Sequence, residues 1–162
     1  MIGNRCSPII ICACVIVSFS SAWASNQNEV RPPADWLQVD YKPLKSLDAI
    51  PAAILKALLL KMPYDPRLAD RGERFNATDV IDAKLPRRRF MFGGTSSRFI
   101  LVYYEHGGRA LHYHLAVFDV GGKKPELVFA AQSPRVQTIG EVKNLVKKGK
   151  LNNKIEETHQ EW

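Results

Sequence analysis

The chain has 162 residues, among them 23 lysines and arginines and 16 aspartates and glutamates, and its formal net charge is +7. This length fits one domain, and a content of 46% hydrophobic and 24% charged residues excludes the disordered and low-complexity classes. The sequence has no collagen period, heptad run or solenoid repeat, and none of its motifs points to a known family.

Residues 1–24 are predicted to be a secretory signal peptide. Arg5 precedes an apolar run over 8–19, whose length is typical of a signal peptide and short for a membrane span. The stretch Ala22-Trp23-Ala24 then supplies a signal-peptidase site. We therefore expect an exported protein, periplasmic or extracellular, whose mature chain starts at Ser25 and has no transmembrane segment. An uncleaved N-terminal anchor is the alternative.

All three cysteines, which are Cys6, Cys12 and Cys14, lie in this leader. The expected mature chain therefore has no thiol, and this excludes a disulfide, a catalytic thiolate and cysteine-based zinc sites. A secreted domain without disulfides depends on its hydrophobic core, which a chain of this length can build.

The mature chain is expected to form a single α+β domain over 25–150, followed by a polar tail over 151–162. An extended arm covers 25–45, because prolines at 32, 33 and 43 exclude a continuous helix there. Trp36 and Tyr41 are apolar anchors by which we expect this arm to lie against the core.

A first helix is predicted over about 48–62. Asp48 is its expected N-cap, the following apolar residues recur at intervals of three and four, and Pro63 ends it. The next residues, 63–86, are rich in turn signals and predict no defined element.

The region of about 87–132 predicts a four-stranded antiparallel β-meander. Four β-rich runs contain the sequences RFMF, RFILVYYE, ALHYHLAVFDV and ELVFAA, and Gly-Gly pairs at 93–94, 107–108 and 121–122 separate them. A second helix follows over about 139–148, because Thr138 and Glu141 form a capping box and Gly149 supplies a stop. We expect the two helices to cover one face of the sheet.

The Gly107-Gly108 pair is expected to form a two-residue hairpin turn. That register places Tyr103 opposite His112 and puts Glu105 on the same face as His112 and His114. A histidine pair at alternate positions of a strand could bind zinc or another divalent transition metal, and Glu105 could be a third ligand. The alternative is a half-exposed face of histidines and aromatic rings that packs against the arm or a partner.

A positive net charge predisposes an exported protein to anionic partners, such as envelope glycans, lipid headgroups or an acidic protein surface. Arg87 and Arg89 open the first strand of the meander and could pair with phosphate, sulfate or carboxylate groups. The alternative for this run is a charged edge strand that resists aggregation. Nucleic acid is disfavoured by the export signal and by the lack of a recognised binding motif.

These features favour a small exported, non-enzymatic binding module that contacts an unidentified envelope or extracellular partner. Its expected binding surface combines the histidine and aromatic face with the basic run, and the candidate residues are Phe99, Tyr103, His106, Arg87 and Arg89. The alternative function is a metal-binding protein or metal-assisted hydrolase that uses His112, His114 and Glu105. No other cofactor is expected.

Overall fold

The computed structural model describes residues 34–62, 64–151 and 153–154. The predicted signal peptide, the first part of the extended arm and most of the polar tail lie outside these residues. So does His159, the one histidine that the strands do not contain.

The fold is built on a five-stranded antiparallel sheet with the strand order β1-β2-β3-β4-β5. The strands are β1 (Lys42–Leu44), β2 (Arg88–Thr95), β3 (Phe99–His106), β4 (His112–Asp119) and β5 (Glu126–Ser133). The α+β class and the four meander strands are confirmed, and the predicted strand number is wrong by one. The additional strand comes from the arm, where Lys42–Leu44 pairs with Gly93–Thr95 of β2. Pro43 is tolerated in β1 because an edge strand can leave one position without a ladder hydrogen bond.

The first helix is shorter than predicted. A 3-10 turn, η2 (Leu47–Ala49), precedes α1 (Ala52–Leu59), so Asp48 is not its N-cap. The reason is Pro51, which disfavours a helical conformation of the residue before it; Ile50 has φ −82° and ψ 127°. None of the helices in the described ranges is long and apolar enough to cross a membrane.

The second helix, α2 (Ile139–Lys147), has the predicted ends. The Thr138 hydroxyl accepts a hydrogen bond from the Glu141 N–H at 3.2 Å, which satisfies a free donor of the first turn. Gly149 has φ 65°, and the Lys150 N–H donates to the Leu145 carbonyl at 2.9 Å. This is the backbone pattern of a Schellman stop, which needs the left-handed conformation that glycine adopts freely.

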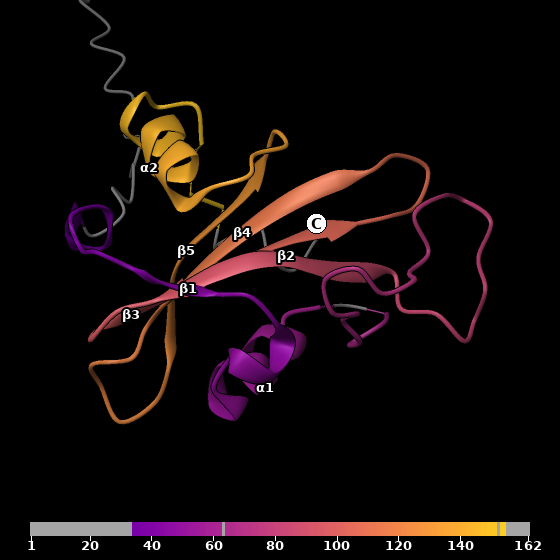
Figure 1. Cartoon of the computed structure of the whole chain (residues 1–162), viewed down its shortest axis with the longest axis horizontal. Helices are drawn as coiled ribbons and strands as arrows, with labels where there is room; N and C mark the ends of the chain where they lie inside the picture. The colour runs from indigo at the N-terminus through magenta and orange to yellow at the C-terminus, as the bar shows by residue number, and fades with distance from the viewer. Residues whose placement is uncertain (1–33, 63, 152, 155–162) are drawn as a thin grey trace, which may run out of the picture.

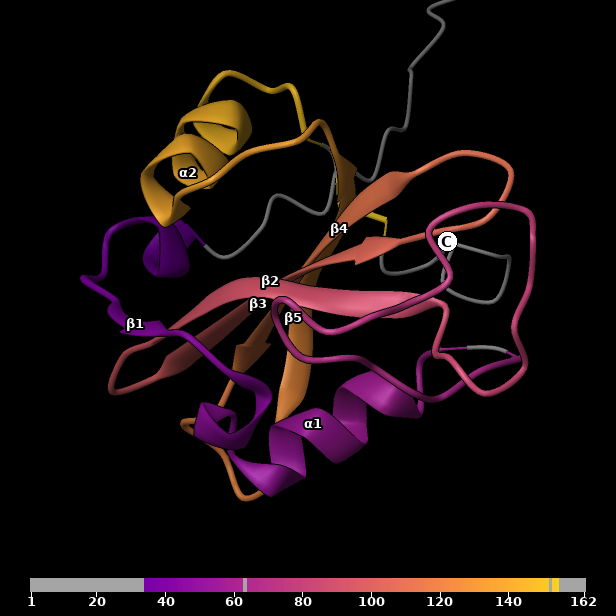
Figure 2. The same ribbon diagram turned by 45° about the vertical axis from the view of Figure 1, so that its right-hand side comes forward.

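The two helices cover opposite faces of the sheet, as Figures 1 and 2 show. The expectation of helices on one face is therefore wrong. One core cluster joins α2 to Phe99, Leu101 and Tyr103 of β3, and it also holds Trp36 of the turn η1 (Ala34–Leu37). The other joins α1 to Ile100, Val102 and Tyr104. The physical reason is that β3 is apolar at successive positions, and a strand of that kind needs cover on both faces.

Candidate functional site

The connection between β3 and β4 is longer than a two-residue turn. It spans residues 107–111, and His106 pairs with His112 while Tyr104 pairs with His114. The predicted register is therefore wrong. Gly107 is not a turn residue but continues the pairing with the neighbouring strand, since its N–H donates to the Arg87 carbonyl at 2.9 Å. The observed pairing of β3 with β4 differs from the predicted pairing by an odd number of residues. The β3 side chains on the same face as His112 and His114 are therefore those of His106 and Tyr104, and not those of Tyr103 and Glu105.

Glu105 consequently lies on the other face of the sheet from His112 and His114. Its carboxylate is almost fully buried and accepts hydrogen bonds from Arg89, with Oε1 at 2.6 Å from Nε. The Arg89 guanidinium also lies over the Phe75 ring, 4.3 Å from its centre. Within the described residues, no group of three or more histidine, cysteine, aspartate or glutamate side chains is placed to hold a metal ion.

Two of the expected binding residues belong to the core. Phe99 is 1% exposed and Tyr103 is 0% exposed, so neither presents a surface to a partner. The Tyr103 hydroxyl donates to the Pro134 carbonyl at 2.9 Å and accepts from the Val136 N–H at 3.2 Å. These bonds satisfy the buried hydroxyl and attach the segment before α2 to the sheet. The predicted half-exposure of these rings is wrong because α2 covers them, whereas Trp36 of the arm packs against them, as the alternative interpretation of this face expected.

The corrected register brings three histidines together on the α1 side of the sheet. The His114 ring centre lies 5.9 Å from that of His106 and 6.5 Å from that of His112, and the ring stacks on Tyr104 at 5.1 Å. His114 is 1% exposed. Burial, together with the positive potential of His106, Arg88 and His112, lowers the pKa of His114 from 6.5 to about 3. His114 is therefore neutral at physiological pH.

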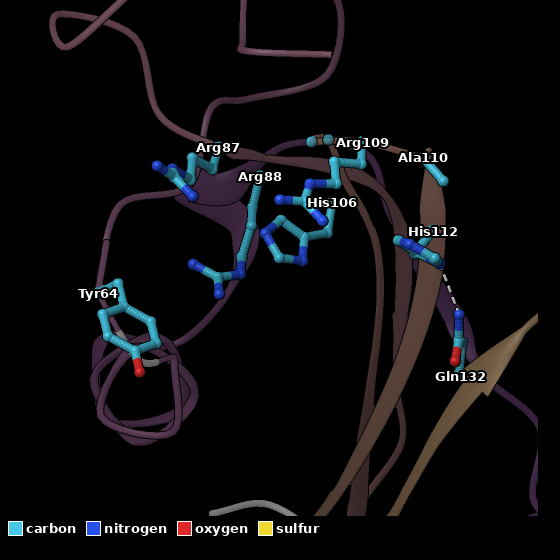
Figure 3. A pocket seen from close by; sticks show the side chains of 10 residues that line it. Tyr64, Arg87, Arg88, His106, Arg109, Ala110, His112 and Gln132 are labelled. Carbon is cyan, nitrogen blue, oxygen red and sulfur yellow. Dashed lines mark hydrogen bonds between the residues drawn. The ribbon is translucent and has the colours of Figure 1, made fainter. Parts of the chain in front are cut away.

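A cavity of about 620 Å³ opens at this end of the sheet, between the start of β2, the connection between β3 and β4, and the residues that follow α1 (Figure 3). We call it the basic pocket. Its lining residues are Tyr64, Arg87, Arg88, His106, Gly107, Gly108, Arg109, Ala110, His112 and Gln132. Among the described residues, three arginines and two histidines line it, and no aspartate or glutamate does. Arg87 lies directly before β2 and Arg88 at its start, His106 at the end of β3 and His112 at the start of β4. Only the pairing of these three strands brings the four side chains together.

Arg88 supplies a fixed positive charge to the pocket. Its side chain is buried beside His106, and one guanidinium nitrogen donates to the Asp65 carbonyl at 2.7 Å. Burial lowers the pKa of Arg88, while Tyr104 and Asp65 act against that shift. A guanidinium keeps its proton in proteins, so the charge remains. The Asp65 carboxylate is held by the Arg67 side chain and the Arg87 N–H, at 2.7 and 3.0 Å.

The other arginine and histidine side chains stand nearer to solvent. Arg87 and Arg109 are exposed, whereas His106 and His112 are half-buried. The Nδ1 atom of His112 lies 2.7 Å from the amide nitrogen of Gln132, a contact that orients the ring. Because guanidinium groups present forked donors in a fixed plane, this set is suited to oxyanions such as phosphate, sulfate and carboxylate.

Tyr64 stands on the opposite side of the pocket from the histidines (Figure 3). It is 84% exposed and has φ 65°, a left-handed conformation that is unfavourable for a tyrosine. Non-glycine residues with this backbone are uncommon, and they cluster at active sites and ligand-binding sites.

The loop over 77–85 is anchored beside the pocket by Asn76. The Asn76 side chain is buried, and its amide nitrogen donates to the carbonyls of Asp82 and Leu85 at 2.9 and 2.8 Å. Its amide oxygen accepts from the Asp82 N–H at 2.9 Å. The two ends of the loop are thereby joined through one side chain.

Replacement of Asn76 by alanine is expected to destabilise the protein by about 2 kcal/mol, because it removes the three hydrogen bonds that this buried side chain makes to the loop. The free energy of unfolding, measured in urea, tests this. Asn144→Ala on the exposed face of α2 is the matched control and should change stability by no more than about 0.5 kcal/mol. Equal losses in the two variants would contradict the assigned role of Asn76.

Sequence reasoning found Arg87, His106 and His112 but missed Arg88, Arg109 and the lining contributed by Tyr64 and Gln132. A signal for Arg88 exists in the sequence. In a strand that carries three consecutive arginines, the middle one faces away from the other two. With the correct register this places Arg88 beside His106, the residue with which it pairs. No local pattern brings Tyr64 to the same place.

Comparison of this chain with known protein families, with curated proteins and with solved structures finds no match.

Proposed function

We propose that this chain is a small exported, non-enzymatic binding module and that the basic pocket is its ligand site. The ligand carries an oxyanion, such as a phosphate, sulfate or carboxylate group, on a partner in the envelope or the extracellular space. The observation that carries the proposal is the lining of the pocket. Five of the described residues around this cavity of about 620 Å³ carry guanidinium or imidazole side chains, and none of the described lining residues carries a carboxylate.

Arginines that face one cavity repel one another. Burial is the main reason that the pKa of Arg88 is lowered, and the charge of Arg87 lowers it further. An anion in the pocket would relieve the repulsion and accept hydrogen bonds from several guanidinium nitrogens at once. The site is concave and of the size of a small-molecule pocket. These features support binding of an anion more strongly than the charged surface predicted from the arginine run alone.

The arrangement of the helices also favours this end of the sheet. Because α1 covers one face and α2 the other, the central strands offer no open face to a partner. The connections at the ends of the strands are the surfaces that remain available, as in many folds whose binding residues stand on loops above a rigid scaffold.

Calorimetric titration with inorganic phosphate and with glycerol phosphate tests the pocket. We expect saturable binding of both, and the affinity should fall as ionic strength rises. Arg87→Ser and Arg109→Ser should each weaken binding by about tenfold, because each removes a charge-assisted hydrogen-bond donor.

The matched control is the pair Lys123→Ser and Lys124→Ser, which removes exposed positive charges from the connection between β4 and β5, at the opposite end of the sheet. Binding in this variant should match that of the unaltered protein. The proposal fails if neither anion binds, or if the lysine and arginine variants lose affinity to the same extent.

A further inference from the structure

The exposed apolar side chains gather at the same end of the sheet as the basic pocket. In the described part of the chain, the large hydrophobic residues that are exposed are Leu60, Tyr64, Val80, Ile81 and Leu111. Leu60 directly follows α1, Tyr64 lines the pocket, and Leu111 lies between the pocket residues Ala110 and His112. Figures 1 and 2 show the connection between β3 and β4 and the long segment before β2 at this same end.

The loop that carries Val80 and Ile81 is attached to the wall of the pocket. The side chain of Asn76 joins the ends of this loop. The main-chain carbonyl oxygen of Asn76 lies against Gly107, so closely that a β-carbon added to Gly107 would come within 1.8 Å of that oxygen. Gly107 itself lines the pocket. Val80 and Ile81, which are 80% and 44% exposed, therefore stand on a loop that is rooted at the rim.

Exposed aliphatic side chains around a cationic pocket are complementary to a membrane surface, which has an anionic headgroup layer above an apolar acyl-chain layer. The pocket is suited to the phosphate of a lipid headgroup, and the aliphatic side chains are suited to the boundary between headgroups and acyl chains. A soluble anion would fill the pocket but leave Leu60, Val80 and Leu111 in water. A glycan would meet them poorly too, since its hydroxyl-rich surface offers little for aliphatic side chains to pack against.

We propose that this end of the sheet docks on a membrane surface rich in anionic phospholipid, with a headgroup phosphate in the basic pocket and with Val80, Ile81 and Leu111 in the interfacial layer. The inference rests on the proposed function, because it names the source of the anion that the pocket binds.

Co-sedimentation with lipid vesicles tests the inference. The full chain is expressed with its own leader and isolated as the host leaves it, and mass spectrometry establishes its N-terminus. The readout is the difference between variants that share this N-terminus, so any contribution of the leader cancels. Vesicles of pure phosphatidylcholine are compared with an equimolar mixture of phosphatidylglycerol and phosphatidylcholine. We expect binding to the mixed vesicles that falls with added salt.

Four variants separate the contributions of charge and apolar contact. Arg87→Ser with Arg109→Ser should weaken vesicle binding by roughly 25-fold, since one basic residue near an anionic surface contributes about a factor of five. Val80→Ser with Ile81→Ser should weaken it by about tenfold, through loss of buried apolar area. Asp79→Asn should strengthen it, because Asp79 is an exposed carboxylate beside Val80. The lysine control, Lys123→Ser with Lys124→Ser, should lose much less than the arginine pair.

Glycerol phosphate separates failure of this inference from failure of the proposed function. The Val80 and Ile81 variant should bind glycerol phosphate as the unaltered protein does, while its vesicle binding is reduced. If glycerol phosphate binds and vesicles do not, or if the Val80 and Ile81 variant binds vesicles normally, the membrane inference is overturned and the pocket remains. A sulfated polysaccharide that binds as tightly as the mixed vesicles also overturns it. If neither vesicles nor glycerol phosphate bind, both proposals fail.

Discussion

Arg89→Met is expected to lower the free energy of unfolding by about 3 kcal/mol, because it leaves the Glu105 carboxylate buried without its cation. The Glu105 side chain is 4% exposed, and Arg89 donates to it at 2.6 Å from both Nε and one terminal nitrogen. The Arg89 side chain is 28% exposed, so water can partly replace it, and the estimate is at the lower end of the range for buried pairs. Chemical denaturation at neutral pH measures the loss.

A double-mutant cycle separates the ion pair from ordinary packing. Glu105→Leu alone removes the buried charge, and the double variant Arg89→Met with Glu105→Leu leaves neither charge. The double variant should regain most of the stability that Arg89→Met loses, since replacing both partners of a buried pair by apolar groups is often close to neutral. Losses that simply add in the double variant would show that Arg89 and Glu105 do not stabilise each other.

Acid is expected to destabilise the protein through His114. The pKa of this imidazole is about 3 in the folded chain, against 6.5 for an ordinary histidine. Between these two values the unfolded chain binds a proton that the folded chain does not. Stability is therefore complete above about pH 6.5 and is lost as the pH falls, by at most about 1.4 kcal/mol for each pH unit. Burial of the ring opposes protonation most strongly, and the positive potentials of His106 of β3, Arg88 of β2 and His112 of β4 add to it.

Denaturant unfolding at pH 7 and pH 4.5, for the unaltered protein and for His114→Phe, measures this effect. Phenylalanine keeps an aromatic ring against Tyr104 but cannot take up a proton. Every other titratable group is shared, so the difference between the two pH dependences isolates His114. The variant should lose less stability in acid than the unaltered protein does. Equal losses would show that His114 is protonated in the folded state or plays no part in acid unfolding.

The parts of the fold that were predicted correctly depend on neighbours in sequence. The cap by Thr138 and Glu141 and the stop at Gly149 each involve residues a few positions apart in α2. Their hydrogen bonds can therefore be predicted from a short stretch of sequence. The four meander strands are likewise marked by β-rich runs, and the glycine pairs at 107–108 and 121–122 lie between strands as predicted. The pair at 93–94 does not, because Gly93 and Gly94 belong to β2 and pair with Val102 and Leu101 of β3. The class of fold follows from these local signals.

The register of the central hairpin was not predictable from the same signals. A Gly-Gly pair is compatible with a two-residue turn and with the longer 107–111 connection. In the longer connection the Gly107 N–H donates to the carbonyl of Arg87, the residue directly before β2, which is distant in sequence. This one difference moved Glu105 to the opposite face from His112 and His114. It replaced the predicted metal ligands with an ion pair to Arg89 and a cluster of histidines beside Arg88.

The sequence by itself determined the α+β class, the meander, the ends of α2 and a positive charge, because each depends on composition or on residues close together along the chain. Only the tertiary structure decided that helices cover both sheet faces, that Phe99 and Tyr103 are core, and that the arm supplies β1. Only the tertiary structure also forms the basic pocket, because its lining residues lie far apart in sequence, between Tyr64 and Gln132. Such a site is set by strand register and long-range packing, which local hydrogen bonds and periodicity do not encode.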